Sequence, residues 1–496
     1  MTQSNGTAAA LLAVATEMRK ESTKATHGNG SGSNKNKSLL PPPPFNQRFD
    51  DVATAERFLD LWGDEICYQA ETRKWLVWDG IRWKQDQLEE VFNNAVEFAK
   101  GLHSPEITSS TEGKKYAQRA NSHAGLNAFL VIAQKKKTVP AAAFDSHPYL
   151  INCTNGTLDL RTFELLPHDR TKLITKVVAC EYDPDAEAPE FLEFLETVQP
   201  DRKIRAFLQR SIGYSLLGVV RERAFWILYG IGNNGKSIFL ILFIKLLRDY
   251  ASGTTANSIM ARKGSQIPND IARLKGQRFV IVPETQEDEK IDAALVKALS
   301  AGDTITARFL FGEFFDFQFT GKLWIATNNK PVITDRSKGF WDRVIVVPFA
   351  QDIPPDKVIK SDDLIANLLA EAPGIFAWAV QGCRDYFELD SLDVPAEIQN
   401  QIDSYRGEQD PIAQFLESRC VTYEQARSNS PNSYLHESDF RAANTNVYRA
   451  YQVFCDESGE SPISKKKFTQ DLLRRGFANG NSGGRYWKGF RLISER

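Results

Sequence analysis

A glycine-rich turn between two apolar runs constrains this chain more than any other feature. Residues 228–240 read LYGIGNNGKSIFL, and Gly230 to Ser237 fit the pattern G-x-x-x-x-G-K-[ST] in full. The run before the turn is typical of a buried strand and the run after it of a buried helix, which is the context that this pattern requires. Glycines let backbone amides turn inward, and the helix start adds partial positive charge. We therefore expect a phosphate-binding loop rather than a structural turn.

The residue types in this loop predict that ATP and Mg²⁺ are the cofactors. Lys236 would reach the β- and γ-phosphates, and Ser237 would ligate Mg²⁺. The residues expected to contact the cofactor are Gly230, Gly232, Asn233, Asn234, Gly235, Lys236 and Ser237.

Hydrolysis also needs a carboxylate at the end of a neighbouring strand. The stretch RFVIVPET supplies Glu284 directly after an apolar run. Many P-loop enzymes place two acids in tandem here, whereas this chain has Pro283 before Glu284. Glu284 would therefore serve both the metal and the attacking water, or share these roles with Glu287 or Asp288. The sequence leaves that choice open.

Two further polar residues border later apolar runs. Asn328 ends KLWIATNN, where a neutral amide can hydrogen-bond the γ-phosphate or the attacking water. Arg343 precedes the run VIVVPF and could reach a nucleotide bound by an adjacent subunit, because a guanidinium can meet phosphate oxygens bidentately. The alternative for Arg343 is an ordinary surface ion pair with Asp342 or Asp335.

The spacing of apolar runs predicts the domain organisation. Four nearly continuous runs, AFWILY, RFVIV, KLWIA and RVIVVPF, alternate with helical stretches, which favours a mostly parallel sheet covered on both faces. We expect a flexible tail over 1–48, a small α+β domain over 49–200, an α/β domain with the glycine-rich loop over 201–390, and a linker with a last small domain over 391–496. The tail is rich in Gly, Ser, Asn and Pro, and cannot bury enough apolar surface to order itself.

Two segments predict contacts with nucleic acid. Alternating runs around Phe311-Gly312-Glu313 predict a hairpin before the third strand, with Lys297 and Arg308 as the nearest candidates to touch a backbone phosphate. Near the C-terminus, two helices followed by two strands around a glycine loop give the order of a winged helix-turn-helix. Solvated charges are the alternative for both segments. The candidate DNA-binding residues of the C-terminal segment are Lys465, Lys466, Lys467, Arg474, Arg475, Arg485, Trp487 and Lys488.

Composition narrows the class of protein. The net charge of −2 offers no global attraction to nucleic acid, so any contact depends on local patches. Six cysteines without a CxxC pair argue against a structural zinc site and a disulfide framework, and suit a reducing cytoplasm. No apolar stretch is long enough to span a bilayer. We expect a cytoplasmic protein without a membrane partner.

The motifs GIGNNGKS, ETQED, KALSAGDTITARFLFGEFFDF, ATNNKP and FWDRVIVVPF, in this order, resemble superfamily 3 helicases. The resemblance is to the helicase portion of the phage/plasmid primase-helicase family, which is related to the poxvirus replicative helicase-primase. It implies an AAA+-like P-loop core, a homo-oligomer in the form of a hexameric ring, and translocation on single-stranded DNA, typically 3′ to 5′.

By motif matching, the resemblance assigns Walker A roles to Lys236 and Ser237, the Walker B role to Glu284, the sensor role to Asn328 and the arginine finger to Arg343. Relatives often carry a second basic residue where this chain has Asp342, so the finger could also be Arg336.

The sequence therefore predicts an ATP-dependent replicative DNA helicase of a mobile genetic element. Only the tail precedes residue 50, so we expect no primase domain, with a primase encoded separately. The alternative is an initiator that binds origin duplex DNA and uses its ATPase for assembly and local melting. A P-loop small-molecule kinase ranks below both, because the inserted hairpin has no evident role in it.

Overall fold

The computed structural model describes residues 48–232, 234–261, 269–283, 289–309, 312–353, 359–429, 435–459, 461–481 and 484–493. The chain forms two compact units, each described here by itself. The first comprises Met1–Pro331 and Asp342–Ile398, and the second comprises Val332–Trp341 and Gln399–Arg496. Nearly all of the predicted tail over 1–48 lies outside the described residues.

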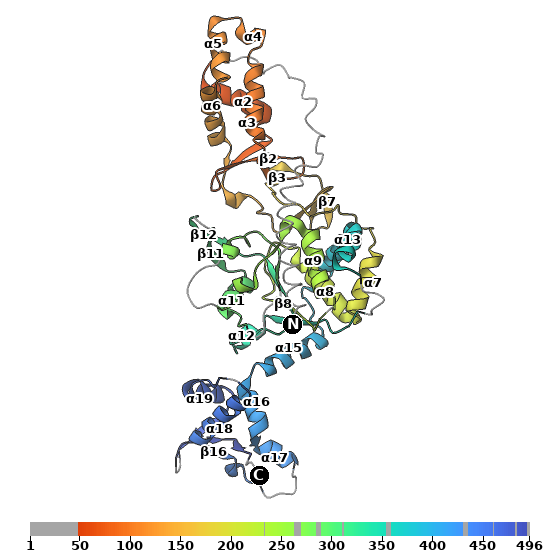
Figure 1. The fold of residues 1–496 in the computed structure, drawn as a ribbon, viewed down its shortest axis with the longest axis vertical. Helices are drawn as coiled ribbons and strands as arrows, with labels where there is room; N and C mark the ends of the chain where they lie inside the picture. Colours follow the sequence, from red (N-terminus) through yellow and green to blue (C-terminus); the bar gives the residue numbers. More distant parts are fainter. Residues whose placement is uncertain are drawn as a thin grey trace. The chain divides into compact units, whose positions relative to one another are not determined.

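The first unit begins with a helical layer beside a small sheet (Figure 1). The helices share one core, in which Phe58, Phe98 and Phe129 meet edge to face or tilted. The sheet has the order β3-β2-β1-β4. The elements of this part are α2 (Asp51–Trp62), β1 (Ile66–Gln69), β2 (Lys74–Trp78), β3 (Trp83–Gln85), α3 (Glu90–Gly101), α4 (Pro105–Thr108), α5 (Thr111–Ala120), α6 (His123–Lys136) and β4 (Thr138–Val139).

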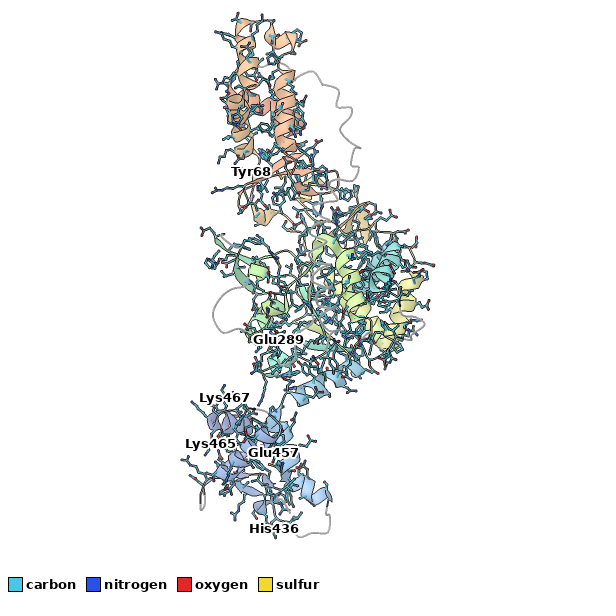
Figure 2. All side chains as sticks on the ribbon, in the orientation of Figure 1. Tyr68, Glu289, His436, Glu457, Lys465 and Lys467 are labelled. Carbon is cyan, nitrogen blue, oxygen red and sulfur yellow. The ribbon has the colours of Figure 1, made fainter. Side chains whose placement is uncertain are left out.

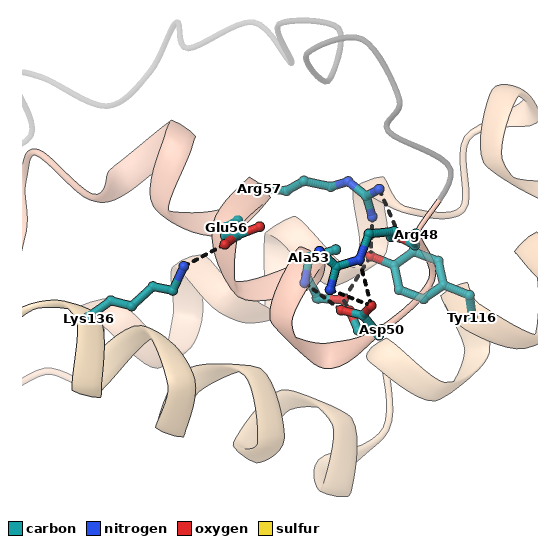
Figure 3. Close-up of polar contacts among 8 residues, drawn as sticks. Arg48, Asp50, Ala53, Glu56, Arg57, Tyr116 and Lys136 are labelled. Carbon is teal, nitrogen blue, oxygen red and sulfur yellow. Dashed lines mark hydrogen bonds and ion pairs between the residues drawn. The ribbon is translucent and has the colours of Figure 1, made fainter.

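Polar contacts fix the start of α2 against α5 (Figure 3). The Asp50 carboxylate accepts the Ala53 N–H at 2.8 Å, and this hydrogen bond lowers the pKa of Asp50. Arg57, which is buried, donates to the Tyr116 hydroxyl at 2.9 Å and to the Arg48 carbonyl at 3.0 Å. These bonds satisfy the buried guanidinium, as a charge inside a helical core requires.

A hairpin turns at Thr154 and Asn155. Strands β5 (Leu150–Cys153) and β6 (Gly156–Asp159) pair antiparallel, and β7 (Glu164–Leu166) extends the sheet.

The predicted parallel sheet is confirmed. Its order is β14-β8-β13-β10-β9, and each neighbouring pair is parallel. Trp226 and Trp324 stack with ring centroids 4.8 Å apart in its core, and neither is exposed. The strands are β8 (Phe225–Tyr229), β9 (Ala251–Gly253), β10 (Phe279–Val282), β13 (Lys322–Thr327) and β14 (Val344–Pro348).

Helices cover this sheet. Two of them, α8 and α14, pack closely against each other at Gly213 of α8 and Gly382 of α14. A Cβ added at Gly213 would lie 2.0 Å from the Cys383 nitrogen, and one at Gly382 would lie 2.0 Å from the Gln209 carbonyl oxygen. The two backbones therefore approach closely, and only glycine fits at either position. The helices are α7 (Pro189–Val198), α8 (Arg202–Ser215), α9 (Lys236–Leu247), α10 (Asn269–Ala272), α11 (Ala293–Ala301), α13 (Ser361–Ala370) and α14 (Ala372–Leu389).

Within the described residues, no single helix has both the length and the apolar composition to cross a membrane. Only α13 and α14 taken together pass that test, and they are bent by 76° at their junction.

Three buried cations tie the amino ends of the strands to the preceding chain. Lys322 donates to the carbonyls of Leu217 and Val219, and Lys176 donates to that of Gly276. Arg278 donates to the carbonyls of Leu216 and Leu150, both at 2.7 Å. Burial lowers the pKa of Lys322 well below its ordinary value and lowers that of Lys176 to about 8.

The second unit contains the predicted helix, helix and strand pair. Its core includes Tyr451, Phe468 and Trp487. Strands β17 and β18 pair antiparallel, β16 joins β18, and β15 pairs with β19. Helix α15 (Ala396–Glu408) spans the boundary between the units. The other elements are α12 (Lys338–Trp341), α16 (Pro411–Arg419), β15 (Cys420–Thr422), α17 (Tyr423–Asn429), β16 (Arg441–Ala443), α18 (Asn444–Glu457), α19 (Lys465–Arg474), β17 (Ala478–Gly480), β18 (Tyr486–Lys488) and β19 (Phe490–Leu492).

The lowered pKa of Lys176 predicts a pH-dependent contribution to stability. The folded protein releases this proton near pH 8, whereas the unfolded chain holds it up to about 10.5. Between these values the unfolded state binds more protons, so the contribution of Lys176 to stability rises with pH. Urea denaturation should therefore show the parent gaining stability relative to Lys176→Met between pH 7 and pH 9.5. An unchanged difference at the two pH values would contradict this expectation.

Candidate functional site

The glycine turn lies at the carboxyl end of β8 and leads directly into α9. Gly235 precedes α9 in the left-handed region, at φ +81°, and Phe239 donates its N–H to the Gly235 carbonyl at 2.9 Å. A Cβ on Gly235 would lie 2.4 Å from Val198 Cγ1, and one on Gly230 would lie 2.0 Å from the Phe349 carbonyl oxygen. Gly232 also has φ +81°, but a Cβ there would face open space. The loop is therefore tightly packed at both ends and open in the middle.

Lys236 is held inside this loop by three neutral oxygens. Its Nζ donates to the Gly230 carbonyl at 2.6 Å, to Asn234 Oδ1 at 2.7 Å and to Asn328 Oδ1 at 3.1 Å. The side chain is only 4% exposed. These three oxygens carry dipoles but no formal negative charge, so a phosphate oxygen would be a stronger partner for the ammonium than any of them. The arrangement fits a triphosphate.

Asn234 has a role that the sequence does not reveal. Its side-chain amide donates to the carbonyl of Phe349, which follows β14, while its oxygen accepts from Lys236. The residue is 3% exposed. Its side chain therefore braces the loop against the last strand, and only its backbone could serve a cofactor. No sequence signal links it to Phe349, because 115 positions separate the two.

The sheet order explains why Asn328 meets Lys236. Strands β8 and β13 are parallel neighbours, with Thr327 opposite Tyr229. Asn328 follows β13 as the loop follows β8, so both lie at the carboxyl edge of the sheet. Parallel sheets of this kind bind ligands at that edge.

Not every residue predicted for this site falls within the described residues. Asn233 and Glu284 lie outside the described residues, as do Glu287 and Asp288. Ser237 is the second residue of α9 and is partly exposed. Among the described positions, no group of three or more His, Cys, Asp or Glu residues could hold a metal ion.

Arg343 lies at the opposite edge of the sheet. Its carbonyl accepts the Phe225 N–H at 2.9 Å, and Phe225 is the first residue of β8, whereas the loop follows the last. Five residues of strand separate the two edges by roughly 15 Å. The Arg343 backbone is therefore remote from the loop that holds Lys236. Arg336 belongs to the second unit, where it lies 3.6 Å from Asp471.

The predicted hairpin is confirmed, and its distal end is aromatic. Strands β11 (Thr304–Arg308) and β12 (Phe314–Gln318) pair antiparallel, with Arg308 opposite Phe314. Phe309 and Phe314 are 49% and 59% exposed. The Arg308 guanidinium lies 5.0 Å from the Phe314 ring centre. Lys297 lies instead on α11 and is partly buried.

Most of the basic residues proposed for the second unit are exposed. Lys465 and Lys467 project outward from α19 (Figure 2), and Lys466, Arg474, Arg485 and Lys488 are also exposed. Arg475 forms ion pairs with Asp410 at 2.5 Å and Asp471 at 2.9 Å. It therefore has a structural role.

The prediction that Trp487 presents its ring to DNA is wrong. The residue lies on β18 but is 1% exposed, in the hydrophobic core of the second unit. Strand alternation places its ring inward while Lys488 faces solvent. The sequence-based interpretation counted aromatic residues on the strand without assigning their faces.

Comparisons with known proteins match three parts of the chain. Residues 55–200 match a family described as D5 N terminal like, and residues 407–482 match one described as Poxvirus D5 protein-like. Residues 228–343, which include the glycine loop, match a family of unknown function. The chain is similar to the poxvirus D5-like helicase-primase proteins.

Relatives of the D5-like type occur in large DNA viruses. A "Putative helicase" of Acanthamoeba polyphaga mimivirus is 30% identical over 342 residues, covering 67% of this chain and 34% of that protein. A "Putative helicase" of Frog virus 3 is 26% identical, covering 59% and 30%. A "Putative primase" of African swine fever virus is 22% identical, covering 65% and 36%. The chain thus spans about a third of the length of these relatives.

A solved structure supports the fold of this chain. The apo structure of the NrS-1 C terminal region has a TM-score of 0.50 and 12% sequence identity, and the match covers 90% of this chain and 100% of that one. At this identity the likeness concerns the fold alone.

The two glycines with φ +81° give a matched test of the loop. An alanine at Gly235 would meet both backbone strain and the Val198 side chain, whereas one at Gly232 would meet the strain alone. Thermal unfolding of the two variants should show the larger loss of stability for Gly235→Ala. Equal losses would contradict the packing described for the loop.

Proposed function

We propose that this chain is the motor of an ATP-dependent DNA helicase that acts in the replication of a DNA virus or another mobile genetic element. The observation that carries the proposal is the buried Lys236 ammonium, held by the glycine loop and Asn328. The D5-like matches and the names of the viral relatives support the same function. The proposed substrates are ATP with Mg²⁺ and single-stranded DNA.

The strand order supports an AAA+-like P-loop core of the superfamily 3 type. Numbered from the strand before the loop, the sheet reads 5-1-4-3-2. In this arrangement β10, which precedes Glu284 in the sequence, lies next to β13, which is followed by Asn328. A carboxylate after β10 would therefore start from the same edge as Lys236.

The residues suggest how the site would respond to ATP. When bound, ATP would supply the phosphoanhydride bond whose cleavage drives the cycle, and Mg²⁺ would offset the charge of its phosphates. Lys236 exchanges its neutral oxygen partners for phosphate oxygens, and this releases Asn328 to orient toward the γ-phosphate or the water. Nucleotide binding would thus change the contacts of Asn328, which follows β13.

The position of Arg343 is compatible with assembly into a ring. Because this residue lies at the far edge of its own sheet, it could act only on a nucleotide held by a neighbouring subunit. We propose a hexamer with ATP hydrolysed between subunits in the cytoplasm of the host cell. The proposal concerns the helicase step, and a primase would act as a partner.

The hairpin of β11 and β12 would be the element that binds single-stranded DNA. Its exposed phenylalanines offer stacking surfaces for bases, and Arg308 offers charge for a phosphate.

A replication initiator is the second candidate function. The exposed lysines at the start of α19 favour it, because a basic second helix followed by a β hairpin suits duplex DNA. Unwinding of a forked substrate with ATP supports the helicase, whereas sequence-specific protection of a duplex without unwinding supports the initiator.

Replacement of Lys236 tests the proposed motor. Lys236→Ala should lower DNA-stimulated ATP turnover by about 100-fold and abolish unwinding, because the phosphates lose their buried cation. Lys245→Ala, in the last turn of the same helix, is the matched control and should stay near the parent. A Lys236→Ala protein that unwinds as fast as the parent would refute the proposal.

Replacement of the exposed phenylalanines tests the hairpin. Phe309→Ala with Phe314→Ala should weaken binding of a labelled single strand by tenfold or more, since each stacked base contributes roughly 1–3 kcal/mol. Leu389→Ala removes an apolar side chain of similar exposure at the end of α14 and should leave the affinity unchanged. Equal affinities for all three proteins would exclude the hairpin as the gripping element.

A further inference from the structure

The second unit contains a small cavity whose wall is rich in arginine. It has a volume of about 250 Å³, and Trp341 and Gln409 form part of its wall. The charged residues around it are Arg336, Arg406, Arg474, Arg475, Asp410 and Asp471.

The two aspartates are already engaged by two of the arginines. Arg475 contacts Asp410 at 2.5 Å and Asp471 at 2.9 Å, and Arg336 lies 3.6 Å from Asp471. Burial alone would lower the pKa of Arg475, but its hydrogen bonds to both carboxylates outweigh that effect and raise it. Asp410 also accepts the Ala413 N–H at 3.0 Å at the start of α16. These carboxylates therefore serve the fold.

The other two arginines differ from this pair. Across the part of the chain that the structure describes, Arg406 and Arg474 make no hydrogen bond or ion pair. Four arginines and two aspartates leave the wall with a formal charge of +2. Gathering like charges around one cavity is unfavourable unless an anion occupies it. The cavity is therefore suited to an anion that accepts hydrogen bonds from more than one guanidinium.

We propose that this cavity binds a phosphate group of a nucleic-acid strand. Guanidinium groups pair bidentately with phosphate oxygens, and the volume lies below the range of pockets that hold drug-sized ligands, so a phosphate fits better than a whole nucleotide. The proposal deepens the proposed function, on which it rests, because it names a contact of the second unit with DNA.

Part of the cavity wall comes from residues 332–341, which follow Asn328 closely in the sequence. Arg336 and Trp341 belong to this segment. Within the second unit, the Ile333 N–H donates to Gln409 Oε1 at 3.1 Å, and Trp341 packs edge to face on Tyr405 at 5.3 Å. A phosphate in the cavity would thus contact the connection between β13 and β14.

The double variant Arg406→Gln with Arg474→Gln tests the proposal. In the full chain without nucleotide, fluorescence anisotropy should show affinity for a labelled single strand falling about tenfold. The slope of log affinity against log salt should shrink by about 1 to 2, because two phosphate contacts are lost. The matched control is Arg427→Gln with Arg449→Gln, which removes the same charge from exposed positions on α17 and α18. This control should change the strand affinity and the salt slope less than the Arg406 and Arg474 double variant does.

Thermal unfolding separates a binding role from a structural one. Because Arg406 and Arg474 have no partner among the described residues, the double variant should melt at or above the temperature of the parent. A lower melting temperature together with unchanged strand affinity would overturn the proposal, since the arginines would then support the fold.

Competing ligands identify the source of the phosphate. Inorganic phosphate, pyrophosphate and ATP should each stabilise the double variant as much as the parent. If one of them stabilises only the parent while strand binding is equal in both, the cavity takes a free phosphate and the assignment to nucleic acid fails. Because these measurements omit ATP turnover, a protein that binds strands but does not unwind them would refute the helicase and leave the cavity assignment intact.

Discussion

The burial of one ammonium group in a loop of neutral oxygens governs this structure. Lys236, at 4% exposure, donates to three oxygens that converge on it from Gly230, Asn234 and Asn328. That convergence requires the parallel pairing of β8 with β13, which brings Asn328 beside the loop. It also requires Phe349 after β14 to hold the Asn234 amide. The contacts of the loop therefore depend on the order of the strands in the sheet.

Local patterns in the sequence predict much of the fold. The unbroken apolar runs predict parallel strands because such strands are buried on both faces, and the sheet has that form. The alternating runs near Phe311 predict a hairpin, and β11 and β12 form it. The motif from Gly230 to Ser237 predicts a strand before it and a helix after it, and β8 and α9 flank it in the structure.

Contacts between distant residues are what the sequence does not show. The bracing of Asn234 by Phe349 and the ion pairs of Arg475 with Asp410 depend on tertiary packing. Trp487 was assigned to the surface because a short strand of mixed residues does not reveal which face is buried. Arg336 and Arg343 are close in sequence but belong to different units, which no local pattern indicates.

Residues 332–341 belong to the second unit although the chain on both sides of them belongs to the first, and this limits how the protein can be divided into fragments. The apolar side chains of this segment, Ile333, Phe340 and Trp341, are 2%, 0% and 4% exposed. Trp341 is covered by Tyr405, which lies beyond the end of the first unit. A fragment that ends near residue 398 would contain residues 332–341 but lack Tyr405. The apolar side chains of that segment would then be exposed to solvent and would favour aggregation. The first unit therefore cannot be separated from the second by dividing the chain at one position.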